Sequence, residues 1–317
     1  MNCSLEQARA AFSSPTALWA SHGIGLVEEG VLQQALHSAD RFDVLTDLVG
    51  FTGLTPAELL PRLRREGRFH YASEHAFWDP KSSTELTWFY RTSVDYLFGL
   101  AWHGVEPLLR GRGKFRHLRE EGPVLEIAPG VGNNGLHMAL NARVPYYYAG
   151  LSLIETSFAQ YRASKRGLGV DAFRVLPPYD AAWKVDPLAA LQPGTPHHGK
   201  IGTVLAFDVL EHVPHFERTV AALVAVLRPG GLIIEQSPFA AEADDPAAAQ
   251  SNGTDTRLHV SRNGVTMEQA MGPLMRMMGS GKGTNIWRKK GADGLWKDTC
   301  CISGFASMCK GWQKRCK

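Results

Sequence analysis

One short segment constrains the fold of this chain more than any other. Residues 124–135 read VLEIAPGVGNNG, an apolar strand that runs into a Gly-x-Gly-x-x-Gly turn, and a helical stretch follows at 136–140. Glycines let the backbone of such a turn approach a ligand closely, and free N–H groups at the helix start can point at it. The segment therefore predicts a strand, a ligand-binding turn and a helix. Dinucleotide-binding proteins use the same spacing, so the glycines alone do not identify the ligand.

Apolar runs alternate with helical patterns from about residue 121 onward, which indicates a parallel sheet with helices on both faces. Apolar residues between 220 and 227 are spaced i, i+3, i+4, i+7, as on one buried helix face, and the Arg-Pro-Gly-Gly sequence that follows ends that helix. Residues 267–278, which contain several methionines, predict a further helix. The expected strands are residues 124–127, 146–151, 172–175, 203–207 and 232–236, with a last one at 284–288.

The length of 317 residues exceeds that of a usual single domain and predicts three regions. Residues 1–118 form a helical N-terminal lid or substrate region, residues 119–290 the sheet domain, and residues 291–317 a basic, Cys-containing tail whose composition also fits a disordered end. In the first region, Thr55-Pro56-Ala57-Glu58 is a capping box that predicts a helix reaching about Glu66. A second helix is expected to begin at Ser83 or Thr84 and to reach about Trp102.

Charge and cysteine content limit the classes of partner. The net charge of +3 is too small to indicate nucleic acid. Residues 282–317 carry nine Lys and Arg against two Asp, which suits a solvated tail more simply than an acidic partner. Four of the five cysteines lie in the last 18 residues without paired Cys-x-x-Cys spacing, so reduced thiols are expected rather than a zinc site or a secreted disulfide framework. Without a long apolar run or a signal sequence, the expectation is a cytoplasmic protein with no membrane partner.

A second informative segment spans residues 203–239, TVLAFDVLEHVPHFERTVAALVAVLRPGGLIIEQSPF. It orders a strand, an Asp-x-x-Glu-His turn, a helix, a Pro-Gly-Gly turn and a strand. With the glycine segment, it resembles the class I S-adenosylmethionine-dependent methyltransferases over about residues 118–240. The resemblance implies an α/β fold, a doubly wound, mostly parallel seven-stranded Rossmann-like sheet with helices on both faces under the N-terminal helical lid. It also implies an enzyme that transfers a methyl group from S-adenosyl-L-methionine by SN2 displacement and releases S-adenosyl-L-homocysteine.

The resemblance also implies where the cofactor lies, since ligands of open α/β sheets bind beyond the carboxyl ends of the strands. Glu126 resembles the acidic residue that organises the methionine pocket, and its alternative role is to bond nearby turn N–H groups. Ser152 departs from the family pattern, which places a ribose-binding acid there. Glu155, three residues on, either reaches the same place or belongs to a first helical turn. The implied cofactor-binding residues are Glu126, Ala128, Pro129, Gly130, Gly132, Asn134, Ser152, Asp180, Asp208 and Val209.

His212 is the candidate general base, because the pKa of histidine suits proton transfer near neutrality. Some relatives use the Asp-x-x-Glu-His turn to hold a divalent ion, with Asp208, Glu211 and His212 as the candidate ligands. A helix-capping and packing role for this turn is the simpler interpretation, and no metal is predicted. Methyl transfer depends mainly on alignment of the reactants, so an obvious catalytic triad is not expected.

The acceptor pocket is expected outside the nucleotide-binding fold, in the aromatic-rich residues 69–103. Ordinary packing of a helical cap explains the same aromatics. The acceptor is expected to be a small molecule that is methylated on oxygen, with nitrogen and sulfur as alternatives, and a homodimer is left open. The candidate substrate-binding residues are Trp88, Tyr90, Arg91 and His259, and Tyr90 is also a candidate catalytic residue.

Three rival functions remain open at this point. A nicotinamide-dependent oxidoreductase is disfavoured by Ser152 and by the Asp-x-x-Glu-His and Pro-Gly-Gly segments. A methyltransferase-like protein could bind the cofactor without turnover. Methylation of a protein or an RNA would use the basic tail and would predict that truncation after about Lys290 abolishes activity.

Overall fold

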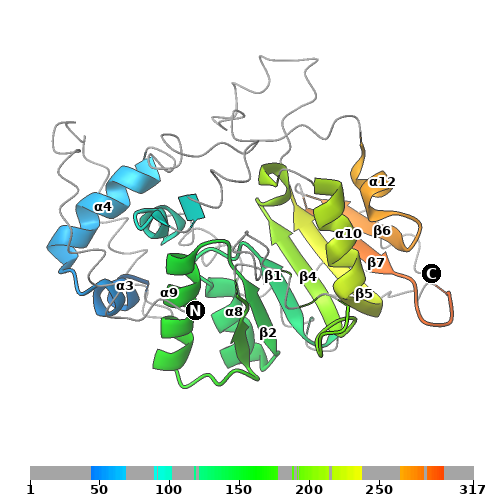
Figure 1. Cartoon of the computed structure of the whole chain (residues 1–317), viewed down its shortest axis with the longest axis horizontal. Helices are drawn as coiled ribbons and strands as arrows, with labels where there is room; N and C mark the ends of the chain where they lie inside the picture. The colour runs from blue at the N-terminus through cyan, green and yellow to red at the C-terminus, as the bar shows by residue number, and fades with distance from the viewer. Residues whose placement is uncertain are drawn as a thin grey trace, which may run out of the picture.

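The computed structural model describes an α/β sheet with helices packed on it and a helical N-terminal part (Figure 1). No helix within this described part is both long enough and apolar enough to cross a bilayer. The described residues are 44–68, 89–90, 92–101, 118, 121–177, 188, 191, 193–213, 216–237, 265–281 and 284–295.

Seven strands form the sheet in the order β3-β2-β1-β4-β5-β7-β6. The first five strands in this order, from β3 to β5, run parallel to one another. The strand β7 runs antiparallel to both β5 and β6. The strand order reverses direction between β1 and β4, which in open α/β sheets is where ligands bind. The predicted fold class is confirmed. The strands are β1 (Val124–Ile127), β2 (Tyr146–Ala149), β3 (Phe173–Val175), β4 (Ile201–Phe207), β5 (Leu227–Gln236), β6 (Met275–Gly281) and β7 (Thr284–Lys289).

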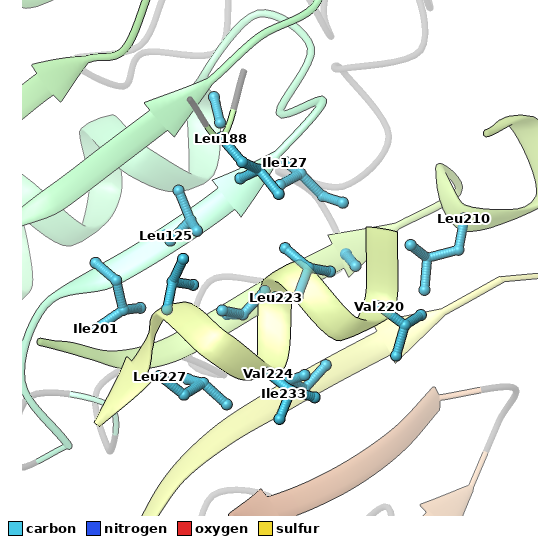
Figure 2. Packing of buried hydrophobic residues seen from close by; sticks show 14 of the residues in the cluster. Leu125, Ile127, Leu188, Ile201, Leu210, Val220, Leu223, Val224, Leu227 and Ile233 are labelled. Atoms are coloured by element: carbon cyan, nitrogen blue, oxygen red, sulfur yellow. The ribbon is translucent and has the colours of Figure 1, made fainter. Parts of the chain in front are cut away.

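Helices cover both faces of the sheet because alternate strand residues are apolar in both directions. Figure 2 shows α10 packing Val220 and Leu223 among Leu125 and Ile233 on one face. On the opposite face, Val124 packs in a second cluster with apolar residues of α8 and α9. The connecting helical elements are α8 (Asn133–His137), which continues as a π-helical turn (Met138–Ala142), α9 (Leu153–Lys165), the 3-10 turn η4 (Leu210–His212), α10 (Phe216–Val226) and α12 (Met267–Met271).

The helical N-terminal part packs against α9 and the glycine turn. It contains α3 (Val44–Thr52), α4 (Pro56–Arg68) and a helical stretch at residues 96–101. Their buried side chains form one cluster with Phe158 of α9 and Val131 of the turn. The predicted capping box is confirmed, because the Thr55 N–H donates to Glu58 Oε2 at 2.8 Å and the Glu58 N–H donates to Thr55 Oγ1 at 3.4 Å. The division into three regions stays a prediction.

The predicted helix over residues 267–278 is wrong. Only α12 is helical, and Gly272 follows it with φ of 68°, a left-handed conformation that ends the helix. The chain then pairs with β7 as the edge strand β6. The sequence holds the stop signal, since Gly272 precedes a proline, but the methionine pattern obscured it. Pairing with a neighbouring strand thus outweighed the local helical preference.

Most strand boundaries differ from the expected ones by one or two residues, and β5 differs by five at its start. The strand β5 begins at Leu227 rather than at Leu232, and its register with β4 shifts between Ile201 and Thr203. Gly230 within β5 has φ of 75°, so the expected Arg-Pro-Gly-Gly turn is present as an irregularity within the strand. The strand β2 ends two residues earlier than expected, at Ala149, because Ser152 already begins α9.

Candidate functional site: the carboxyl ends of β1, β2 and β4

The turn after β1 has an unusual backbone. Ala128, Gly130 and Gly132 have φ of 47°, 57° and 75°, in the left-handed region that favours glycine. Ala128 adopts this conformation without being glycine, and such residues are concentrated at functional sites. The Gly132 N–H donates to the Pro129 carbonyl at 3.1 Å, which closes the turn before α8. The backbone is therefore held in one compact shape at the sheet edge where a ligand is expected.

The three glycines of the motif serve different neighbours. A Cβ on Gly135 would lie 2.2 Å from the ring of Tyr146, and one on Gly132 would lie 3.1 Å from the ring of Tyr148. Gly135 is thus required by Tyr146, whereas Gly132 is crowded by Tyr148 and also has the left-handed φ of 75°. A Cβ on Gly130 would have Leu100 at 3.9 Å as its nearest neighbour, so Gly130 is required by its backbone conformation and leaves the turn open to close approach.

Glu126 is buried in β1 and bonds side chains rather than turn N–H groups. The Asn134 side-chain amide donates to its Oε1 at 2.9 Å, and the Tyr146 hydroxyl donates to its Oε2. Burial raises the pKa of Glu126 to about 7, although both hydrogen bonds favour the charged form. Glu126 therefore fixes the start of α8 to the strand beneath it.

The carboxyl end of β2 is organised by Glu155 rather than by Ser152. Ser152 is fully buried, and its hydroxyl accepts from the Glu155 N–H at 3.1 Å as the N-cap of α9. In return, the Glu155 carboxylate accepts from the Ser152 N–H at 3.3 Å, and it also accepts from the Leu151 N–H at 3.1 Å. A Cβ on Gly150 would lie 3.0 Å from Glu155 Oε1, so this carboxylate fills the space directly after the strand. The structure gives Ser152 a capping role, and its ribose contact stays a prediction.

Tyr148 links Glu155 to the glycine turn. Its hydroxyl lies 2.9 Å from Glu155 Oε1 and also bonds the Gly130 carbonyl. Burial raises the pKa of Glu155 to about 7. Because a tyrosine hydroxyl carries one proton, both contacts are hydrogen bonds at once only when Glu155 supplies a second proton. The shape of the turn at Gly130 is thereby connected to a titrating group. The three adjacent tyrosines of residues 146–148 and the Ser-x-x-Glu capping box were the sequence signals for this arrangement.

Two residues after β4 differ in accessibility. Asp208 is exposed and has φ of 49°, and its N–H donates to the Gln236 carbonyl at 2.7 Å. Val209 is buried in the hydrophobic cluster beneath α10. Of these two predicted cofactor residues, the structure therefore brings only Asp208 to the surface of the site.

The Glu211-His212 pair follows in η4. Glu211 is buried, and its Oε2 has no hydrogen-bond partner. Burial raises the pKa of Glu211 to about 8, and the neighbouring carboxylates Asp208 and Glu235 add to this rise. His212 has a side chain 30% exposed, and its Nε2 lies 3.9 Å from Glu211 Oε1. No group of three or more His, Cys, Asp or Glu within the described ranges is arranged to hold a metal ion.

Tyr90 lies in an aromatic cluster that reaches the same edge of the sheet. Its ring centroid lies 5.3 Å from that of Phe89 and 5.6 Å from that of Tyr96, and the cluster packs against Leu151 after β2. Tyr90 is only 6% exposed, which favours a packing role over a catalytic one. The other predicted site residues, Asp180, Trp88, Arg91 and His259, lie outside the described residues.

Comparison with known proteins identifies the class. Residues 101–266, more than half of the chain, match the profile of a methyltransferase domain family. The chain belongs to this family, and its strand order and glycine turn make it a class I S-adenosylmethionine-dependent methyltransferase. The enzyme class and the cofactor predicted from the sequence are thereby confirmed, and the nicotinamide-dependent alternative is set aside. The open left-handed turn at Gly130 fits the close approach of such a cofactor.

Many solved structures resemble the chain, each at low sequence identity. The chain is 17% identical to the (4+2)-cyclase SpnF, with a TM-score of 0.38, and the match covers 56% of this chain and 59% of that one. It is 16% identical to phosphoethanolamine N-methyltransferase 2 of Haemonchus contortus, with a TM-score of 0.36, and covers 49% of this chain and 34% of that one. It is 17% identical to a geranyl diphosphate methyltransferase, with a TM-score of 0.36 and coverages of 50% and 56%. No curated protein sequence matches the chain. None of these similarities identifies an acceptor.

Proposed function

We propose that the protein methylates a small-molecule acceptor, on oxygen in the first place, with nitrogen and sulfur as the alternatives. The observation that carries this proposal is that the helical N-terminal part reaches the carboxyl end of β2, where its buried aromatic cluster of Phe89, Tyr90 and Tyr96 packs against Leu151. The three rings pack this part against the edge of the sheet, and an acceptor site enclosed beneath it suits a small molecule better than a polymer. The cysteine pattern supports a reducing compartment such as the cytoplasm.

The cofactor residues of the proposal come from two strand ends. We assign the turn to the methionine and ribose parts of the cofactor, with Asp208 beyond β4 at the rim. Glu126 holds Asn134 in place, and Glu155 holds Tyr148 against the Gly130 carbonyl. When bound, S-adenosylmethionine supplies a methyl group that its sulfonium has already made electrophilic. The protein therefore has to bind, align and exclude water rather than activate the donor. The turn residues are Ala128, Pro129, Gly130 and Gly132.

His212 is the proposed base for an acceptor that must lose a proton. Its ring is partly exposed beside the carboxyl end of β4, and an imidazole titrates in the useful range. The variant His212→Gln is expected to lower kcat about 100-fold, which is typical for loss of a general base. Cofactor affinity and the thermal midpoint should stay near the wild-type values. A kcat within twofold of wild type would leave His212 with a packing role.

The proposal is tested by an acceptor panel. Purified protein is incubated with S-adenosylmethionine and with hydroxylated, amine and thiol small molecules, while release of S-adenosylhomocysteine is measured. Turnover with a hydroxylated compound supports the proposal. Turnover only with protein or RNA substrates contradicts it. Tight cofactor binding with no turnover on any acceptor would favour a protein that binds the cofactor without using it.

A further inference from the structure

Arg162 of α9 is a fully buried guanidinium that connects three parts of the chain. Its Nε donates to Asp47 Oδ2 of α3 at 2.8 Å. One of its terminal nitrogens donates to the Val131 carbonyl and to Asn133 Oδ1, the latter at 2.7 Å. Arg162 therefore joins the N-terminal helix α3 to the glycine turn and to the first residue of α8.

The charge of Arg162 requires Asp47. A buried guanidinium is costly unless it is paired and hydrogen-bonded. Asp47 is itself buried, and it also accepts from Lys165 at 3.0 Å and from Arg166 at 2.6 Å. Burial raises the pKa of Asp47, but attraction to Arg162 and Arg166 lowers it by more than that. The net pKa lies below its ordinary value, so this carboxylate stays charged near neutrality.

The contact with Val131 fixes a peptide plane of the turn. Because a trans peptide is planar, a carbonyl that faces Arg162 directs the following N–H the opposite way. That N–H belongs to Gly132, and it donates to the Pro129 carbonyl at 3.1 Å. Arg162 thereby holds the middle of the turn, and Asn133 holds its end. Pro129 and Gly132, which this arrangement holds in place, are among the turn residues assigned above to the cofactor.

We propose that Asp47 and Arg162 are positioning residues for the methyl donor: an ion pair from the N-terminal helix α3 holds the glycine turn in the shape that receives S-adenosylmethionine. The proposal rests on the cofactor site described above. Asp47 lies outside residues 101–266, the part that matches the family profile. The N-terminal helices are then part of the cofactor site in this chain, besides any role in acceptor binding.

The test measures binding of S-adenosylhomocysteine to the full-length chain by calorimetry, for the wild type, Asp47→Asn, Arg162→Lys and Arg162→Met. Loss of a charge-assisted contact to the turn should raise Kd about ten- to a hundredfold. Arg162→Lys keeps the charge beside Asp47 but lacks the planar fork, so it should fall between wild type and Arg162→Met.

A matched control separates positioning from stability. Asp95→Asn breaks another ion pair of the N-terminal part, in which Arg65 donates to Asp95 Oδ2 at 2.8 Å. It should lower the thermal midpoint and leave Kd within about twofold. All binding is measured well below each midpoint, where a purely structural role cannot change Kd because nearly all molecules are folded.

The outcomes are distinct. Weakened binding by folded Asp47→Asn and Arg162→Lys, with the control unchanged, supports the proposal. Wild-type Kd in folded Asp47→Asn and Arg162→Lys overturns it, whether or not Arg162→Met folds. If the wild-type protein itself fails to bind S-adenosylhomocysteine, the proposed cofactor site is wrong, and the positioning role of Asp47 and Arg162 is not what failed.

Discussion

The two ends of the sheet treat their buried charges in opposite ways. At the amino end, before β1, the Glu121 carboxylate accepts from Arg288 at 3.0 Å and lies 3.3 Å from Arg228, and Arg288 also donates to the Gly230 carbonyl at 2.9 Å. At the carboxyl end, Glu126 and Glu155 are bonded by neutral groups and their pKa values are raised to about 7 by burial. The pairing of Glu121 favours stability, whereas burial of Glu126 and Glu155 among neutral groups costs stability at the place where the cofactor is expected.

Left-handed backbone occurs at both ends, but in different settings. The non-glycine residues Ala128 and Asp208, both with positive φ, directly follow β1 and β4 at the carboxyl end. At the amino end, Gly122 and Gly230 are glycines, and Arg143, with φ of 53°, is the C-cap of the π-helical turn that precedes β2. Strain at Ala128 and Asp208 persists because the surrounding structure holds it, which is typical of binding sites.

The largest effect is expected from Gly130→Arg. A side chain at φ of 57° is strained, and it would occupy the open approach to the turn. The Kd for S-adenosylhomocysteine should rise more than about 100-fold by calorimetry. The matched control is Gly167→Arg, since Gly167 has φ of 69° and nothing within 4 Å of its added Cβ. The control should leave Kd unchanged, and equal losses in both variants would contradict the assignment of the turn.

At the amino end, Glu121→Gln should affect stability alone. The change removes the carboxylate that pairs with the buried Arg288, which costs about 1–3 kcal/mol of unfolding free energy. Denaturant unfolding measures this loss. Cofactor affinity should stay within twofold, because no contact of Glu121 reaches the glycine turn in the described residues. A large change in Kd would remove the functional distinction between the two ends.

The corresponding change at the carboxyl end, Glu126→Gln, should weaken binding about tenfold. The neutral amide cannot accept from both Asn134 and Tyr146, since one of its two ends is a donor. Loss of one of these two hydrogen bonds costs about 1–2 kcal/mol and weakens the attachment of α8 to β1. Calorimetry with S-adenosylhomocysteine measures the effect. Unchanged affinity would give Glu126 a purely structural role.

The last effect is a pH dependence of stability, with no change in cofactor affinity expected. Glu211, with its pKa raised to about 8, binds a proton in the folded state that the unfolded chain releases above its ordinary pKa of 4.5. Its contribution to stability is therefore fully present below about pH 4.5 and is lost as pH rises through about 8. The unfolding free energy of wild type should fall between pH 5 and 8.5. The variant Glu211→Gln should show a shallower fall, by about 1.4 kcal/mol for each unit by which the folded-state pKa is raised, and an identical slope would contradict the raised pKa.

Local patterns predicted much of this fold. The strand bounds of β1 were correct, and those of β4 and β7 were nearly so. Short apolar runs that are bounded by turn residues are strong local signals for a buried strand. The prediction was wrong where pairing with a distant strand decided the outcome, as for β6. Long-range contacts carried no sequence signal either: Arg162 and Asp47 are 115 residues apart, and nothing in their surroundings marks them as partners.

Site prediction was limited by the same physics. The glycine spacing correctly located the turn, but it could not show that Gly135 is required by Tyr146 of β2. The motif order placed Ser152 near the ribose but could not show that its hydroxyl also caps α9, and the ribose contact stays a prediction. Glu155 was left between two roles, and the structure shows that its capping role and its position after β2 are compatible.

The most direct measurement is hydrogen exchange on the full-length protein with and without S-adenosylhomocysteine, with NADH as the control ligand. S-adenosylhomocysteine should slow exchange at residues 128–135 and 150–155, while amides near Glu121 and Arg228 at the amino end stay unchanged and NADH has no effect. Protection at the amino end instead, or equal protection by NADH, would contradict the assignment of the carboxyl end as the methyl-donor site.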